Sequence, residues 1–219
     1  MKNNILLLVL CVGILQATAQ KIVEKHIPLT QRKLIAMNFQ ISDSIRIITW
    51  NKNEVYVKSS INVNDNKNND DYRMSFGESS DDIDISGKLE MEKGKGSGWN
   101  NDCNCSCRSE IWHEVYIPEG ADISVETING NIVLSGNIAG IRAHTISGFI
   151  DLALAPERKA DLKLNTISGT MYSNFDFPAE TGSLRKVGGH SITTQINGGG
   201  GTPIDLETIS GNIFLRKAA

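Results

Sequence analysis

The chain has 219 residues, of which 40% are hydrophobic and 21% are charged, and its formal net charge is −3. This length and composition fit one or two globular domains and exclude both a disordered acidic protein and a bundle of membrane helices. Because nucleic-acid-binding proteins usually carry a basic surface, the negative charge also argues against nucleic acid as a partner.

Residues 1–19 have the pattern of a secretory signal peptide. A short basic segment at Met1–Asn4 precedes the apolar run Ile5–Leu15, and Ala17-Thr18-Ala19 has the small-x-small spacing of a signal-peptidase site. The apolar run is shorter than the roughly 20 residues that cross a bilayer. We therefore expect an exported protein that starts at Gln20 and has no membrane-spanning segment, located in the periplasm, on the cell surface or outside the cell.

Residues 20–114 contain short strands without a clear repeat. Period-2 alternation of apolar residues predicts strands around 45–47, 55–57, 61–63 and 83–85. The oxygen-rich segment Asp65–Asp71 lacks the spacing of known calcium loops and is expected to be a surface loop. A Gly-rich loop is expected at 92–101, and helical periodicity is absent, so the pattern indicates an all-β chain. Trp99 and Trp112 could form an exposed sugar-stacking patch, but the low aromatic content and the position of Trp112 at the start of a strand favour burial.

Three cysteines and a histidine follow this loop. Cys103, Cys105, Cys107 and His113 are ligand types that zinc prefers. In an extended strand, however, Cys103 and Cys107 would lie about 13 Å apart, too far for one ion. Outside the cytoplasm a disulfide among the three cysteines is favoured, which leaves one thiol unpaired. We therefore treat the cysteines first as disulfide candidates and, together with His113, second as metal ligands; no cofactor is expected.

The C-terminal half, residues 115–219, contains a repeat. Four near-identical tetrads have first residues spaced by 18, 21 and 42 positions, and the long gap indicates a degenerate copy at Lys186–Gly189. Apolar residues alternate before each tetrad and after three of them, which predicts a strand, a corner and a second strand. The tetrads are Thr127-Ile128-Asn129-Gly130, Thr145-Ile146-Ser147-Gly148, Thr166-Ile167-Ser168-Gly169 and Thr208-Ile209-Ser210-Gly211.

A strand–corner–strand unit about every 20 residues predicts a single-stranded parallel β-helix, or solenoid, that forms one domain over residues 20–219. In such a coil the equivalent residues of successive turns stack in columns about 4.8 Å apart. We expect the threonines to point inward with their hydroxyls bonded to neighbouring groups, and the four isoleucines to fill the corner. An immunoglobulin-like sandwich, the competing fold, gives no reason for identical corners.

The same alternation turns six charged or titratable side chains outward, where they form a possible binding face. Of these, Glu126 and His144 come nearest to an acid–base pair, but no set of nucleophile, base and orienting group is visible. A solvated face of mixed charge is the alternative. The six residues are Glu126, Arg142, His144, Lys163, Asp205 and Glu207.

These motifs resemble those of a bacterial family, the putative adhesins, which are exported β-helical proteins of uncharacterised activity. The resemblance rests on Val115–Gly120, the four tetrads and the segment Asn197–Ile213, with a further match at Ile45–Val57. It covers most of the mature chain. It implies the β-helical fold and, more weakly, adhesion, because the matching residues are core and corner positions.

Taken together, the sequence favours a non-catalytic protein of the cell envelope that presents a β-helical surface for binding or adhesion. The expected partner is an envelope or host glycan or protein, and the expected state is a monomer. One alternative is a carbohydrate-active β-helix enzyme, which would place paired acids on the outward face. A second alternative is a metal or redox role for Cys103, Cys105 and Cys107.

Overall fold

The structure is a computed structural model that describes residues 20–31, 34–90, 108–177, 184–186 and 189–218. Within these residues the chain forms fifteen strands and one 3-10 turn, η1 (Asn69–Asp71), so the all-β prediction is confirmed. No helix in this part of the chain is long and apolar enough to cross a membrane. The strands are β1 (Lys21–Pro28), β2 (Leu34–Trp50), β3 (Glu54–Val63), β4 (Tyr72–Glu78), β5 (Asp82–Leu89), β6 (Ser109–Pro118), β7 (Asp122–Ser135), β8 (Ile141–Ser147), β9 (Ile150–Leu154), β10 (Ala160–Ser168), β11 (Met171–Ser173), β12 (Leu184–Lys186), β13 (Gly189–Ile196), β14 (Ile204–Ser210) and β15 (Ile213–Lys217).

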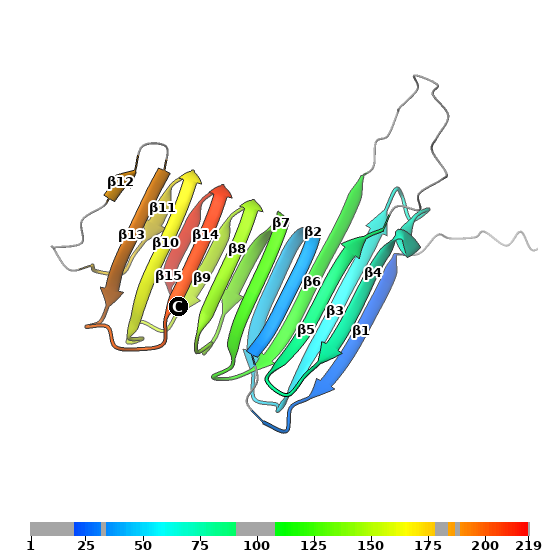
Figure 1. Cartoon of the computed structure of the whole chain (residues 1–219), viewed down its shortest axis with the longest axis horizontal. Helices are drawn as coiled ribbons and strands as arrows, with labels where there is room; N and C mark the ends of the chain where they lie inside the picture. The colour runs from blue at the N-terminus through cyan, green and yellow to red at the C-terminus, as the bar shows by residue number, and fades with distance from the viewer. Residues whose placement is uncertain (1–19, 32–33, 91–107, 178–183, 187–188, 219) are drawn as a thin grey trace, which may run out of the picture.

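The strands lie in two layers that face each other (Figure 1). The long strands β2 and β7 belong to both layers, because the register of their pairing shifts between Ile41 and Ser44 of β2. The first layer contains, in order, β4, β5, the N-terminal halves of β2 and β7, β8, β14, β10, β13 and β12. The second layer contains β1, β3, β6, the C-terminal halves of β2 and β7, β9, β15 and β11.

The sheet is mixed, whereas the sequence predicted a wholly parallel coil. Pairing is parallel in the middle of both layers, where the tetrads lie. It becomes antiparallel toward the ends, between β4 and β5, among β1, β3 and β6, and among β10, β13 and β12. The expected degenerate turn at Lys186–Gly189 is replaced by the β12–β13 hairpin, in which Lys186 pairs with Gly189. The parallel pairing of the repeat therefore does not extend to the ends of the layers.

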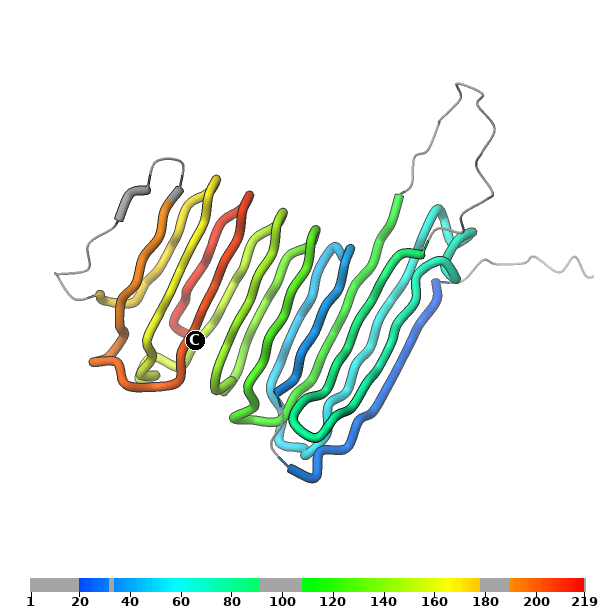
Figure 2. Tube along the Cα trace, viewed as in Figure 1, coloured from blue at the N-terminus to red at the C-terminus, as the bar shows by residue number. Residues whose placement is uncertain are grey.

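The order of the strands also departs from the order of the chain. β14 comes last in the chain among the strands of the first layer, yet it lies between β8 and β10. In the second layer β15 likewise lies between β9 and β11. Figure 2 shows this red C-terminal segment enclosed by the green and yellow strands. The insertion places Asp205 between Arg142 and Lys163, which separates two cations that the expected order would have made neighbours.

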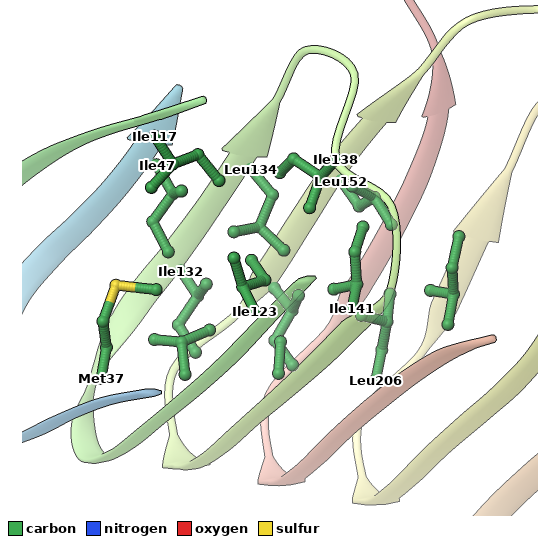
Figure 3. Packing of buried hydrophobic residues seen from close by; sticks show 14 of the residues in the cluster. Met37, Ile47, Ile117, Ile123, Ile132, Leu134, Ile138, Ile141, Leu152 and Leu206 are labelled. Carbon is green, nitrogen blue, oxygen red and sulfur yellow. The ribbon is translucent and has the colours of Figure 1, made fainter. Parts of the chain in front are cut away.

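The core lies between the two layers. Alternate residues of each strand point inward, and almost all of the inward positions are buried aliphatic side chains. Figure 3 shows Ile123, Ile141 and Leu206 of the first layer meeting Ile132, Leu134 and Leu152 of the second. Burial of these side chains on both layers fixes the register, because a slip of one residue would expose every one of them.

The threonines of the tetrads behave as the sequence predicted. Each is buried, and its hydroxyl donates to a backbone carbonyl. Thr145 donates to the carbonyl of Gly130 at 3.1 Å, Thr208 to that of Gly148 at 3.1 Å, and Thr166 to that of Gly211 at 3.0 Å. Each of these three bonds joins one corner to the corner stacked on it, whereas Thr127 donates to Asn129 of its own tetrad.

The isoleucines of the tetrads do not fill the corner, contrary to the sequence prediction. Their side chains are exposed, from 36% for Ile209 to 53% for Ile167. The strand continues through the preceding threonine, and because that threonine points inward, the next side chain must point outward. The corner is filled instead by glycines, which stack so closely that a Cβ at Gly211 would overlap the carbonyl oxygen of Gly148.

Candidate binding surface

The six residues predicted to form a binding face do lie side by side on the outer surface of the first layer, which we name the charged face. They form two rows that cross β7, β8, β14 and β10. One row contains Arg142, Asp205 and Lys163 in that order. The second row contains Glu126, His144 and Glu207, followed by Asn165.

Neighbouring groups on the charged face largely satisfy one another. Lys163 Nζ lies 3.1 Å from a carboxylate oxygen of Asp205, and the side-chain amide of Asn165 donates to Glu207 at 3.1 Å. Two buried atoms, His144 Nε2 and Asp205 Oδ1, have no hydrogen-bond partner. Because opposite charges alternate along the row Arg142, Asp205 and Lys163, this row is suited to solvation more than to the binding of one charged ligand.

His113, a candidate metal ligand, lies in the core. Its Nδ1 is 2.8 Å from the Ser59 hydroxyl, its Nε2 is 3.1 Å from the Tyr72 hydroxyl, and its ring stacks on Phe39 with centroids 4.0 Å apart. Burial lowers the pKa of His113 to about 3 and raises the pKa of Tyr72. Both imidazole nitrogens are therefore occupied by hydroxyls, in a position that solvent does not reach.

The other candidate ligands, Cys103, Cys105 and Cys107, lie outside the described residues. Within the residues that the structure does describe, no group of three His, Cys, Asp or Glu side chains is placed so that it could hold a metal ion. The two ring nitrogens of His113 instead form hydrogen bonds with the hydroxyls of Ser59 and Tyr72.

The outer surface of the second layer has a different character, and we name it the aromatic face. Seven aromatic side chains project from it, all of them half-buried or exposed. In the described part of the charged face, no aromatic side chain projects outward. The seven are Trp50, Tyr56, Trp112, Tyr116, Phe149, Tyr172 and Phe214.

The rings at the β1–β3–β6–β2 end of this face contact one another. Tyr56 and Tyr116 are cross-strand partners with ring centroids 5.9 Å apart, and Trp50 lies 5.4 Å from Tyr116. His26 of β1 continues the group at 4.5 Å from Tyr56, and Lys52 Nζ lies 4.5 Å from the centre of the Trp50 ring. Contacts between rings, and between a cation and an indole, hold these side chains in fixed positions on the sheet.

A row of charges runs beside these rings, two residues from the ring on β1, β3 and β6 and four residues from Trp50 on β2. It contains Glu24 of β1, Lys58 of β3, Glu114 of β6 and Arg46 of β2, each the cross-strand neighbour of the next. Lys58 Nζ lies 3.8 Å from Glu24. Partial burial raises the pKa of Tyr56, as does Glu24, which accepts a hydrogen bond from its hydroxyl and repels the phenolate. The signs alternate along the row, so its net charge is zero.

Trp112 lies on the other side of the charged row and is 54% exposed. Its cross-strand neighbours are two serines, Ser60 of β3 and Ser44 of β2. Among the described residues, no ring or hydrogen-bonding group contacts its indole. Trp is one of the residue types most enriched among the side chains that dominate binding energy at interfaces.

No protein-family model matches the chain, and no curated protein matches it. Among solved structures, the chain is similar to a putative cell adhesion protein from Clostridium sporogenes ATCC 15579, with 12% identity, a TM-score of 0.57, and coverage of 91% of this chain and 100% of that one. A putative adhesin from Bacteroides fragilis NCTC 9343 matches with 7% identity, a TM-score of 0.25, and coverage of 91% and 98%. The likeness to the Clostridium protein shows a shared fold.

Sequence reasoning located the charged face, but of the aromatic face it considered only Trp112 and expected that residue to be buried. The signal was present in the strand Ile111–Ile117, because Ile111, His113 and Val115 share the buried side and Trp112 must then face solvent. The low aromatic content of the chain, 6%, gave no indication that these residues lie together on one face. The pairing of β1 and β6 with β3, which brings Tyr56 between His26 and Tyr116, is a property of the tertiary fold.

Proposed function

We propose that the chain is an exported, non-catalytic binding protein of the bacterial cell envelope, an adhesin-like protein whose aromatic face is the binding surface. The observation that carries the proposal is the gathering of outward aromatic side chains on one face of a two-layered stack of strands. The signal-peptide pattern of residues 1–19 supports export to the periplasm, the cell surface or the medium. The fold shared with a protein described as a putative cell adhesion protein adds support.

The aromatic face has the composition of a binding surface. Trp, Tyr and Arg are the residue types that contribute most to binding energy at interfaces. Trp112, Tyr116 and Arg46 occur here on the paired strands β6 and β2. Because sheet strands hold their side chains rigidly, little conformational entropy is lost when a ligand binds. Such a surface fits a protein whose role is to bind an envelope or host component.

A monomer is part of the same proposal, because the edges of the second layer are protected. Lys25 of the edge strand β1 occupies an inward-facing position, opposite the buried Val57. At the other end of this layer, β11 has only three residues. Inward-pointing charges and short edge strands are devices that prevent edge-to-edge pairing. Analytical ultracentrifugation is expected to show one species of monomer mass.

Glycan cleavage on the charged face is the alternative function, since the unpartnered Nε2 of His144 lies between Glu126 and Glu207. The double variant Glu126→Ala/His144→Ala separates the two functions. On our proposal it binds envelopes as well as the wild type does, and neither protein releases reducing or unsaturated ends from envelope glycans. Release by the wild type that the double variant lacks would support the enzyme.

Truncation of the central ring, Tyr116→Ala, is expected to weaken binding at least tenfold, because Tyr116 contacts both Tyr56 and Trp50. The measurement is saturation binding of fluorescently labelled protein to isolated bacterial envelopes and to cultured host cells, after circular dichroism has confirmed the fold. The Glu126→Ala/His144→Ala protein is the matched control on the opposite face. Equal binding by Tyr116→Ala and the wild type would refute the assignment to the aromatic face.

A further inference from the structure

Trp112 presents part of a flat apolar ring system to solvent. Its indole is 54% exposed, and its neighbours Ser44 and Ser60 are too small to reach over it. On the same strand, the alternate residues Ile111 and His113 are buried, so the backbone that carries Trp112 is held by the core. The position is therefore a rigid platform for a ligand that has an apolar face of its own.

The charged row supplies hydrogen-bonding groups of both kinds close to this platform. Glu114 follows Trp112 by two residues on β6, about 7 Å along the strand, with Lys58 and Arg46 on the two neighbouring strands. Lys58 and Arg46 donate hydrogen bonds, whereas carboxylates such as Glu114 accept them. Arg46 is exposed and Glu114 is half-buried, so these groups are accessible to a ligand.

The balance of charge in this row distinguishes between classes of ligand. A polyanion would meet Glu24 and Glu114 as well as Lys58 and Arg46, so it would gain little from Coulomb attraction. A protein partner would have to cover four charges, whereas the centres of protein interfaces are depleted of charged residues. A neutral sugar chain avoids both costs, because each ring has an apolar face for the indole and a rim of hydroxyls that both donate and accept.

We infer that the ligand of the aromatic face is a neutral glycan, with one sugar ring stacked on Trp112 and its hydroxyls bonded to Glu114, Lys58 and Arg46. This inference rests on the proposed binding function and specifies the ligand class. The tyrosine and tryptophan rings on the far side of the charged row extend the surface across three rows of side chains. A chain of several sugars is therefore expected to bind more tightly than a monosaccharide.

The test uses affinity gel electrophoresis and titration calorimetry of the full mature protein with soluble polysaccharides. The neutral probes are a β-1,4-glucan, a β-1,4-xylan and an α-mannan, and the anionic probes are polygalacturonate and heparin. We expect saturable binding to at least one neutral probe and none of comparable strength to the anionic ones. Trp112→Ala is expected to weaken this binding at least tenfold and Trp112→Phe to retain part of it, whereas Ile146→Ala, an exposed apolar truncation at the corner, leaves it unchanged.

The outcomes separate this inference from the proposed function. If no neutral probe binds while binding to envelopes or host cells still depends on Tyr116, the glycan inference is wrong and the binding function stands. Preference for polygalacturonate or heparin, or equal binding by Trp112→Ala and the wild type, also overturns the inference. If the protein binds neither the probes nor the cell surfaces, both proposals fail.

Discussion

Replacement of Gly211 by alanine is expected to lower the free energy of unfolding by about 3 kcal/mol or more. The Cβ would overlap the carbonyl oxygen of Gly148 in the neighbouring turn. That carbonyl accepts the hydroxyl of Thr208, and the Gly148 amide donates to Ser210 at 3.1 Å. Because the obstacle is backbone that is hydrogen-bonded within the stack, it cannot move aside as a flexible side chain would. Steric overlap at this corner should therefore separate the stacked strands on either side of it.

Gly120→Ala is the control for Gly211→Ala. Gly120 has a left-handed backbone, with φ of 72°. No atom of the described residues lies within 4 Å of the position that a Cβ would occupy, so alanine there introduces conformational strain but no steric overlap. Its expected cost is about 1 kcal/mol. Thermal unfolding followed by circular dichroism should show Gly211→Ala melting roughly 6–12 °C below the wild type and Gly120→Ala a few degrees below it. Equal shifts for the two variants would mean that close stacking of the corners does not limit stability.

The local pattern of the sequence was sufficient to predict the buried apolar residues that alternate before and after the tetrads. Alternation placed pairs such as Ile132 and Leu134 correctly, and the identical tetrads placed the threonine hydroxyls. The same rule, extended by one residue beyond Thr127, would also have placed Ile128 on the outside, since Ile123, Val125 and Thr127 point inward. The mistake about the isoleucines came from treating the corner as a break in the strand.

The order of strands could not be derived from local pattern. The tetrads at Thr145, Thr166 and Thr208 are identical, so any two of them can stack in register. The choice depends on side chains between the tetrads, where Asp205 pairs with Lys163 and lies opposite Arg142. Cross-strand charge pairs contribute only fractions of a kcal/mol each, and a sequence does not reveal which strands are adjacent.

The hydrogen-bond partners of His113 could not be predicted from the local sequence pattern either. Ser59 and Tyr72 are 54 and 41 residues away along the chain. The position of Tyr72 also depends on Gly87, where a Cβ would overlap the tyrosine hydroxyl. From sequence, His113 beside three cysteines suggested a metal ligand; the tertiary fold surrounds it with hydroxyls. This environment gives His113 a measurable effect on stability.

Acidification is expected to lower the free energy of unfolding through His113 by about 3 kcal/mol between pH 7 and pH 4. Burial lowers the pKa of His113 in the folded protein from its ordinary 6.5 to about 3. Below pH 6.5 the unfolded chain takes up a proton that the folded protein does not bind, so unfolding becomes more favourable as the pH falls toward 3. At pH 7 both states are neutral at this residue and the penalty is absent.

The double variant Ser59→Ala/His113→Phe isolates this effect, measured by urea denaturation at pH 7, 5.5 and 4. Phenylalanine keeps the stacking on Phe39, and alanine at position 59 removes a hydroxyl that would otherwise be buried without its partner. The variant should be less stable than the wild type at pH 7, by about 1–3 kcal/mol, because the Tyr72 hydroxyl loses its bond to the ring. On acidification, however, the variant should lose less stability than the wild type, because it lacks His113. The difference between the two losses should equal the contribution of His113, since the surface carboxylates are the same in both proteins. Parallel losses in the two proteins would show that the buried imidazole takes up its proton without unfolding, and that the core around it is open to water.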